Sequence, residues 1–240
     1  MPIYDIAGLK VQMDCGGRTE QQAQAYLAKE QENVTPDITV SITPERIAAA
    51  QAEHPELNGN NWEYMLSGSD FYTNLLRYNG ILLHSSCVVV DGVAYAFSAD
   101  SGTGKSTHTK LWLQRFGDRA YMLNDDKPAI RCINGTVYAC GTPWSGKHDR
   151  STPAIVPLGA IVFLERSEQN WIRKADTKKA VFSIFSQTVR QLGPVAMERL
   201  FDVVETLFDK VPLYELGCNI SEEAAALSYE TIKRSVNDFE

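Results

Sequence analysis

The chain has 240 residues, a length that fits one large domain or a smaller body with an appendage. It carries 23 Lys and Arg against 30 Asp and Glu, a net charge of −7, which argues against a nucleic-acid-binding protein because such a protein needs a basic face. Hydrophobic residues make up 44% and charged residues 22%, ordinary globular values that argue against a disordered chain and a coiled coil.

Neither the N-terminal segment nor any later window indicates contact with a membrane. Residues 1–17 lack a cationic start followed by an apolar run, the pattern of a secretory signal. The most apolar window, residues 81–90, is interrupted by His84 and two serines and is too short to span a bilayer. Five scattered cysteines without a C-x-x-C pair favour reduced, buried thiols. We therefore expect a cytoplasmic protein.

The front of the chain predicts two helices and a strand. Thr19 and Gln22 form a capping-box pattern ahead of a helix that reaches about residue 28. Alternating hydrophobic residues over 37–43 predict a strand. The Thr-Pro pair at 43–44 is typical of the first two positions of a helix, so a second helix is expected to begin there.

The domain organisation follows from a change in pattern near residue 80. Residues 1–80 predict an α/β section packed on a core formed by residues 81–240, the two making one compact unit. The polar stretch 58–61 is the best candidate for a boundary. We expect the sheet of the core to take strands from the front section and from residues 213–216.

From residue 81 onward, hydrophobic runs bounded by turn residues predict alternating strands and helices. Asp91-Gly92 and Asn134-Gly135 are two-residue signatures of hairpin turns. Gly117 is typical of a helix end, and Ser221 of a helix start. Hairpins combined with one strand–loop–helix unit predict an α/β fold with a mixed sheet. The expected strands cover 81–90, 93–98, 120–123, 160–164 and 213–216, and the expected helices cover 105–116, 179–191 and 195–210.

Residues 99–106, A-D-S-G-T-G-K-S, match the phosphate-binding pattern G-x-x-x-x-G-K-[ST] apart from Ala99 at its first position. Glycines let the loop turn its N–H groups toward phosphate oxygens, and the following helix N-terminus adds partial positive charge. Lys105 is expected at the β and γ phosphates and Ser106 at Mg²⁺. The expected nucleotide-binding residues are Asp100, Ser101, Gly102, Thr103, Gly104, Lys105, Ser106 and Thr107. For Thr107, an ordinary place in the first helical turn fits equally well.

An acidic pair follows the loop by one helix and one strand. Asp125 and Asp126 lie 20 and 21 residues after Lys105, and side chains of adjacent strand residues point in different directions. One carboxylate can therefore bind Mg²⁺ while the other faces a hydroxyl as general base, and the spacing does not say which does which. His84 by itself is typical of a hydrogen-bonded core residue in a strand.

The segments SADSGTGKST and LNDD together resemble the kinase domain of HPr kinase/phosphorylase and, more distantly, phosphoenolpyruvate carboxykinase. The resemblance covers about residues 80–165, and His84 precedes Lys105 by 21 residues, as the family's histidine precedes its loop lysine. It implies a mixed-sheet P-loop kinase fold. It further implies Asp125 as the general base toward a serine hydroxyl, His84 as the neighbour that orients it, and Asp126 as a carboxylate on the magnesium side.

Residues 141–151, G-T-P-W-S-G-K-H-D-R-S, resemble the corresponding segment of smaller HPr-kinase-related proteins. Lys147 and Arg150 both follow a flexible glycine, Gly146, and such cations can stabilise charge on a transferred phosphoryl group. An ordinary solvated loop fits the same residues. Trp144 is expected either to pack the base of this loop or to stack on a nucleobase or peptide.

These observations favour an ATP- and Mg²⁺-dependent kinase that phosphorylates a hydroxyl, in the first place a serine of a peptide or small protein. Two alternatives stay open: a nucleotide-binding sensor or partner module without transfer, and a kinase for a small metabolite such as free serine. Neither nucleic acid nor a membrane is an expected partner, and a homo-oligomer is compatible with the resemblance. Convergence of His84, Asp125 and Lys147 at the mouth of the loop would favour transfer, and their dispersal would favour the module.

Overall fold

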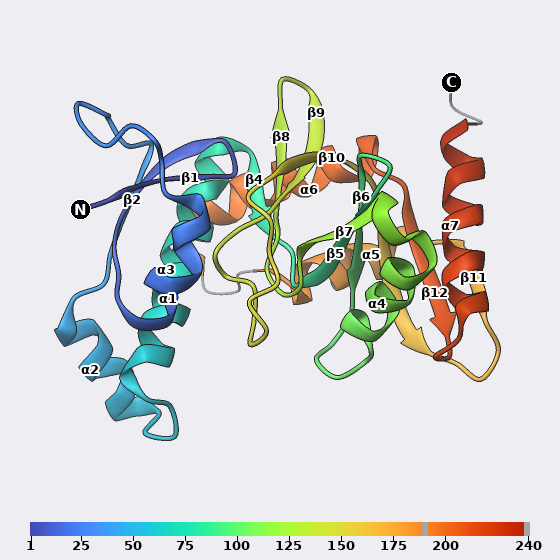
Figure 1. Ribbon diagram of the computed structural model, residues 1–240, viewed down its shortest axis with the longest axis horizontal. Coiled ribbons are helices and arrows are strands. Elements are labelled where there is room, and N and C mark those ends of the chain that lie inside the picture. Colours follow the sequence, from blue (N-terminus) through green and yellow to red (C-terminus); the bar gives the residue numbers. More distant parts are fainter. Residues whose placement is uncertain (189–191, 238–240) are drawn as a thin grey trace.

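The computed structural model describes residues 1–188 and 192–237, and its strands form two sheets (Figure 1). A three-stranded sheet belongs to the front of the chain, and a nine-stranded mixed sheet belongs to the remainder. The expected α/β class with a mixed sheet is confirmed. The larger sheet includes β12 (Leu213–Cys218) but none of the first three strands, so the expectation that it recruits strands from the front section was wrong for these three.

The small sheet has the order β1-β2-β3, with β1 and β2 antiparallel and β2 and β3 parallel. It packs against helix α3 through a buried cluster that includes Tyr4, Val11 and Phe71. The division of the chain at residue 80 stays a prediction. The elements of this part are β1 (Ile3–Ile6), β2 (Leu9–Asp14), α1 (Gly17–Ala23), η1 (Gln24–Tyr26), β3 (Ile38–Ser41), α2 (Pro44–Glu53), α3 (Gly59–Leu75) and η2 (Leu76–Tyr78).

Helix starts in this part follow local chemistry with two corrections. Thr43 caps α2 as predicted, its side chain accepting from the Arg46 amide. The capping box at Thr19 was wrong, because α1 begins two residues earlier and the Thr19 hydroxyl is buried without a partner. The polar stretch 58–61 forms the start of a helix and not a linker, because Asn58 caps α3 and the following residues form its first turn.

The larger sheet is organised around the long strand β10, whose two halves have different partners. Its first residues pair antiparallel with β9, and from Leu158 onward it runs parallel to β6 and β12. Strand β5 is antiparallel to both β6 and β7, which makes β6 and β7 parallel. Its strands before β12 are β4 (Gly80–Leu82), β5 (Ser85–Val90), β6 (Val93–Ser98), β7 (Ala120–Asn124), β8 (Ala129–Ile133), β9 (Thr136–Cys140), β10 (Ile155–Arg166) and β11 (Trp171–Lys174).

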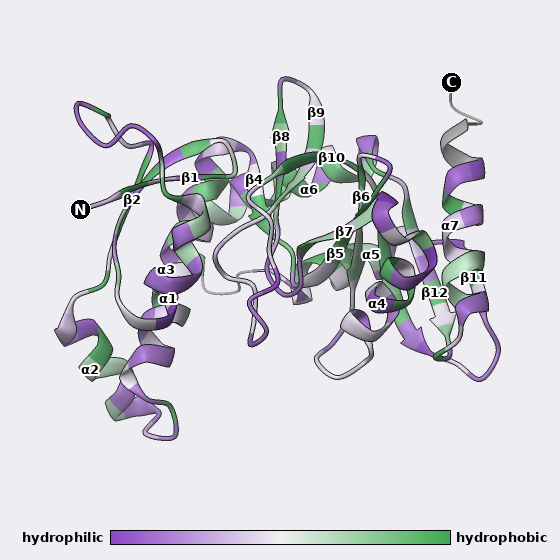
Figure 2. Ribbon diagram, viewed as in Figure 1, coloured by the Kyte–Doolittle hydropathy of each residue, from purple (hydrophilic) through white to green (hydrophobic). Residues whose placement is uncertain are grey.

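Helices cover both faces of this sheet. On one face Trp112 of α4 packs with Phe97 and residues of α7, and on the other Ile184 of α5 and Leu200 of α6 pack with Val89. Figure 2 shows strands of this sheet coloured mainly hydrophobic. The remaining helices are α4 (Lys105–Phe116), η3 (Gly117–Arg119), α5 (Thr177–Ser186), α6 (Pro194–Lys210) and α7 (Glu222–Asn237).

The predicted turns are confirmed, while one strand and one helix are shorter than expected. Asp91, Gly92, Asn134 and Gly135 all have positive φ, as two-residue hairpin turns of this type require. The strand predicted over 81–90 is interrupted at residues 83–84. The helix predicted over 179–191 ends at Ser186, and the last three residues of that range lie outside the described part of the chain.

Two predictions about the chain as a whole can be compared with the structure. All five cysteines are free thiols, but only Cys87 and Cys140 are buried as expected, whereas the other three are partly exposed. Among residues 1–188 and 192–237, no helix is both long enough and apolar enough to cross a membrane.

Candidate active site

Four segments meet at one edge of the larger sheet. The parallel strands β6, β7 and β10 end there, and the antiparallel strand β5 begins there. The glycine-rich loop follows β6, the acidic pair follows β7, and His84 precedes β5. The loop before α4 lies at the lower end of the sheet in Figure 1. The carboxyl ends of parallel strands are where α/β folds bind ligands, so this edge is the candidate active site.

The loop between β6 and α4 has the backbone of a phosphate cradle. Gly102 has φ +80° and Gly104 has φ +124°, conformations that residues with a side chain rarely adopt. Nothing lies within 4 Å of a Cβ built on either glycine, so the space in front of both is open. Helix α4 begins at Lys105, directly after the loop, and its N-terminus therefore faces this space with free N–H groups.

Lys105 lies between the loop and the acidic pair. Its ammonium is buried and donates to the carbonyl oxygens of Ala99, at 2.8 Å, and Asp100, at 3.3 Å. Burial lowers the pKa of Lys105, whereas the nearby carboxylates, Asp126 foremost, act to raise it. The only full positive charge in the loop motif is thus held where phosphate oxygens and carboxylates can share it.

Asp125 is bound to the inner side of α4. The Ser86 hydroxyl donates to Asp125 Oδ1 at 2.6 Å, because a carboxylate only accepts, and it contacts the Thr109 hydroxyl at 2.8 Å. Thr109 also bonds to the carbonyl of Lys105 at 3.2 Å. These bonds hold Asp125 beside the first turn of α4, where Ser106 and Thr107 have exposed side chains.

Asp126 points to a different set of groups. Its Oδ1 lies 3.5 Å from Nε2 of His84, and its Oδ2 forms an ion pair with Lys127. The side-chain oxygen of Asn124 accepts from the amides of Asp126, at 2.9 Å, and Lys127, at 2.7 Å, which forms a tight turn and directs the two carboxylates apart. The expected pairing of His84 with Asp125 is therefore replaced by a pairing with Asp126.

His84 is half-buried and its charge is disfavoured. Burial lowers its pKa most, and Lys105 lowers it further, while a hydrogen bond from its ring to Gln187 and the charge of Asp126 act in the opposite direction. The net effect leaves a neutral imidazole at pH 7, with one ring nitrogen free to take a proton.

Trp144 packs the base of the segment 141–151. Its side chain is fully buried, stacks on Phe71 at 4.8 Å between ring centroids, and donates from Nε1 to the Ser67 hydroxyl at 3.2 Å. Stacking on a nucleobase or peptide, the other role considered for Trp144, needs an exposed ring face and was wrong.

Gly146 brings the same segment against the acidic pair. It has φ +77°, and a Cβ built on it would lie 3.0 Å from the Cβ of Asp126. Its amide donates to the Tyr64 hydroxyl at 3.1 Å, and its carbonyl accepts from Gln22 at 3.1 Å and from Arg18. The front section of the chain therefore holds this segment in place beside Asp126.

The two cations predicted in this segment have exposed side chains. The backbone carbonyl of Arg150 accepts from the Asp125 amide at 3.0 Å, so Arg150 lies next to the acidic pair, but its guanidinium faces solvent. Lys147 follows Gly146 directly and is exposed as well. The structure thus brings together the loop, Lys105, both aspartates and His84, and leaves the charged ends of Lys147 and Arg150 outside.

Two residues at this edge of the sheet were not predicted from the sequence. Arg166, the last residue of β10, donates to the carbonyls of Gly102, at 2.6 Å, and Thr103, at 3.4 Å. Gln187, directly after α5, bonds to His84 at 2.7 Å and to Asp100 at 2.8 Å. Both lie more than 60 residues from the motif along the chain. The one available signal is the position of Arg166 at a strand end.

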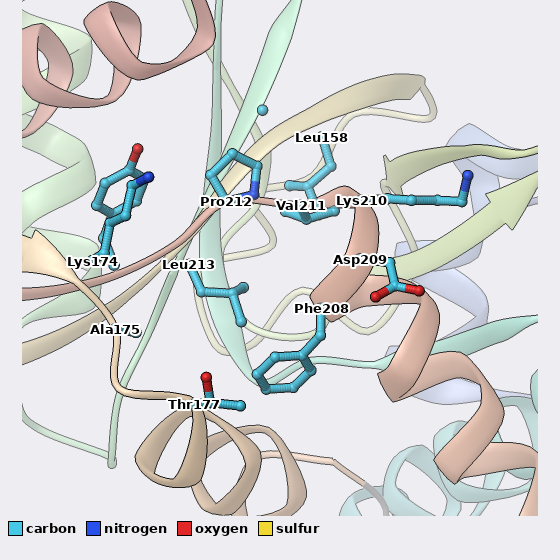
Figure 3. Close-up of a pocket in the computed structure, with 12 residues that line it drawn as sticks. Leu158, Lys174, Ala175, Thr177, Phe208, Asp209, Lys210, Val211, Pro212 and Leu213 are labelled. Carbon is cyan, nitrogen blue, oxygen red and sulfur yellow. The ribbon is translucent and has the colours of Figure 1, made fainter. Parts of the chain in front are cut away.

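Two cavities flank the sheet at opposite ends. A cavity of about 670 Å³ adjoins the loop and is lined by Gly102, Gly104, Thr107 and Arg166 among others. Another of about 590 Å³ lies where β12 begins, between Leu213 and Phe208, far from the loop (Figure 3). The first is the size of a site for a small organic molecule and is continuous with the phosphate cradle.

Comparisons with known proteins show a distant structural similarity. No family model matches the chain, and no curated protein matches it. Among solved structures, the HPr(Ser) kinase/phosphatase from Coxiella burnetii is similar over 65% of this chain and 95% of its own, with 11% sequence identity and a TM-score of 0.38. A similarity of this strength assigns neither family nor function to the chain.

Proposed function

We propose that the chain is an ATP- and Mg²⁺-dependent kinase that transfers the γ-phosphoryl group to a hydroxyl, namely a serine of a peptide or small protein, on a P-loop fold of the HPr kinase type. The observation that carries the proposal is the meeting of Lys105 with Asp125, Asp126 and His84 at the end of the glycine-rich loop. A glycine-rich turn that binds nothing has no need of a buried lysine and two carboxylates beside it.

The nucleotide would bind along the loop. The open cradle at Gly102 and Gly104 and the start of α4 fit the phosphates, with Lys105 exchanging carbonyl oxygens for phosphate oxygens. The cavity of about 670 Å³ between α4 and Arg166 fits the nucleoside. In this arrangement Arg166 stabilises the loop through its carbonyls, and its positive charge lies close to the phosphates.

The donor set fits Mg²⁺ in the way phosphoryl-transfer sites use it. Mg²⁺ bound to a nucleotide takes one or two protein oxygens and fills its other positions with phosphate and water. Ser106 on the first turn of α4 and Asp125 beside that turn supply two such oxygens. When bound, the ion would neutralise charge on the β and γ phosphates.

The surroundings of the two aspartates favour Asp126 as the proton acceptor. Asp125 is engaged by Ser86 next to α4, whereas Asp126 faces His84 and the segment 141–151. The serine oxygen would attack the γ-phosphorus, the bond to the β–γ bridging oxygen would break, and the serine proton would pass to the Asp126–His84 pair. Lys147 and Arg150 would close over the phosphoryl group from the exposed segment.

Incubation with γ-labelled ATP and separate acceptors tests the proposal. The acceptors are a serine-containing peptide library, a set of small proteins, and free serine. We expect Mg²⁺-dependent label on serine of a peptide or protein. Label on free serine alone would assign the metabolite-kinase activity instead, and nucleotide binding without label on any acceptor would favour the sensor module.

Matched variants assign the base. Asp126→Asn should lower the rate of transfer at least about a hundredfold, because general-base contributions are of this size. Asp118→Asn, an exposed aspartate after α4, is the control and should leave the rate unchanged. Full transfer by Asp126→Asn together with complete loss in Asp125→Asn would return the role of base to Asp125.

A further inference from the structure

A continuous row of polar groups connects the glycine-rich loop with the acidic pair. Gln187 Nε2 donates to Asp100 Oδ1 at 2.8 Å, Gln187 Oε1 lies 2.7 Å from His84 Nδ1, and His84 Nε2 lies 3.5 Å from Asp126 Oδ1. The backbone strengthens this row, since the His84 amide donates to the carbonyl of Gln187 at 2.7 Å. Gln187 itself is buried.

The chemistry of these groups fixes the direction of every hydrogen. The Asp100 carboxylate only accepts, so the amide nitrogen of Gln187 must face it. The amide oxygen then faces His84, and because this oxygen only accepts, the hydrogen of the imidazole must reside on Nδ1. The neutral ring consequently presents a lone pair at Nε2, on the side of Asp126.

Two acceptors thus face each other across 3.5 Å, the Nε2 lone pair and Asp126 Oδ1. Neither atom supplies a hydrogen to the other, and a hydroxyl lying beside the two can donate its one hydrogen to either of them or share it between both. The charged groups that act on the ring are Asp126, Lys105 and Lys127, and burial, together with Lys105, lowers the His84 pKa, which disfavours protonation of Nε2.

We propose that Gln187 is a positioning residue that locks His84 in its Nδ1–H form and ties that form to Asp100 of the phosphate loop. The role of this fixed Nδ1–H form in phosphoryl transfer rests on the proposed function, whereas the hydrogen bonds that fix it do not. Through it, the position of the loop backbone is linked to the orientation of the imidazole that receives the acceptor hydroxyl. Neither Asp100 nor Gln187 needs to touch the acceptor.

Nitrogen NMR of protein labelled at its four histidines tests the lock, with His84 assigned by the loss of its signals in His84→Phe. The wild-type protein should show His84 protonated at Nδ1 and not at Nε2. Gln187→Met keeps the volume of the side chain but removes both hydrogen bonds, and it should release the ring into a mixture of forms. Asp100→Asn should also give a mixture, since an amide at position 100 can both donate and accept.

His84 protonated at Nε2 in the wild-type protein, or an unchanged Nδ1–H form in both variants, would overturn the proposal. In transfer assays Gln187→Met should lower kcat about tenfold or more, with the KM for MgATP changed less than about threefold, because the nucleotide contacts remain. If the Nδ1–H form depends on Gln187 but the protein shows no transfer activity, the positioning role of Gln187 is supported and the proposed kinase function is refuted.

Discussion

Ser86 donates its hydroxyl hydrogen to Asp125 Oδ1 across 2.6 Å, and both residues are held against α4 through Thr109. The bond fills one acceptor position of Asp125 and fixes its carboxylate away from His84. Asp126, one residue later, is turned the other way by Asn124 and faces the imidazole. Adjacent carboxylates thereby acquire different surroundings, which is what a site needs if one is to serve a metal and the other a proton.

Replacing Ser86 with Ala should destabilise the fold, because Ser86 is fully buried and its loss leaves Asp125 and Thr109 each short of a partner. We expect the free energy of unfolding to fall by about 1–3 kcal/mol. Urea unfolding measures it, with an unchanged slope m. Ser69→Ala, an exposed serine on α3, is the control, and equal midpoints for the two variants would contradict the assigned bond.

Gly146→Ala should impair transfer more than stability alone explains. Its positive φ costs an alanine about 1–2 kcal/mol, and the new Cβ would meet Asp126 at 3.0 Å. Gly135→Ala is the matched control, since Gly135 has φ +83° in an open hairpin turn with nothing within 4 Å of its Cβ. Gly146→Ala should lose at least as much stability in urea as Gly135→Ala, and under conditions where both variants are folded it should lose at least about tenfold more transfer activity. Equal transfer activity in the two variants would show that the segment 141–151 does not contribute to the active site.

Arg166→Ala should weaken MgATP binding about tenfold, because hydrogen bonds from a charged donor contribute about 1.5–3 kcal/mol and two of them restrain the loop. Calorimetric titration measures the affinity. Arg115→Ala removes an exposed arginine from the far end of α4 and should bind MgATP as the wild-type protein does. A wild-type affinity in Arg166→Ala would show that the loop keeps its shape without this contact.

Cys140 should resist alkylation in the folded protein. Burial raises its pKa to about 12, and a raised thiol pKa means that the fold disfavours the thiolate, the reactive form. Mass spectrometry after iodoacetamide treatment should find Cys140 unmodified in the native state and modified in guanidinium chloride. Rapid native modification would contradict its burial.

Much of the fold could be predicted from the sequence because its signals are local. The β6–loop–α4 unit and the two hairpin turns are encoded by residues adjacent in the chain, and the structure has them at the predicted positions. The front section was harder, since β1 and β2 are joined by Ala7-Gly8, a turn that carries a weaker signal than Asn-Gly or Asp-Gly. The helix start predicted at Thr19 was wrong because a capping pattern can also occur within a helix.

The candidate site was predicted in its parts and not in its connections. The motif predicts the loop and Lys105. The partner of each aspartate, however, depends on the turn made by Asn124 and on Ser86, which lies on a neighbouring strand. Gln187 reaches the site only because α5 ends beside His84, a relationship between segments about 100 residues apart that no local pattern contains. Three-dimensional packing decides such contacts.

The most direct test of the account is a calorimetric titration of MgATP into the wild-type protein, Lys105→Ala and Lys110→Ala. Lys110 is an exposed lysine on the same helix as Lys105 and serves as the matched control. The account predicts binding of one nucleotide by the wild-type protein and by Lys110→Ala, with affinity at least about tenfold lower in Lys105→Ala because charge-assisted bonds to phosphate are lost. Absence of MgATP binding by the wild-type protein, or equal affinity in all three, would contradict it.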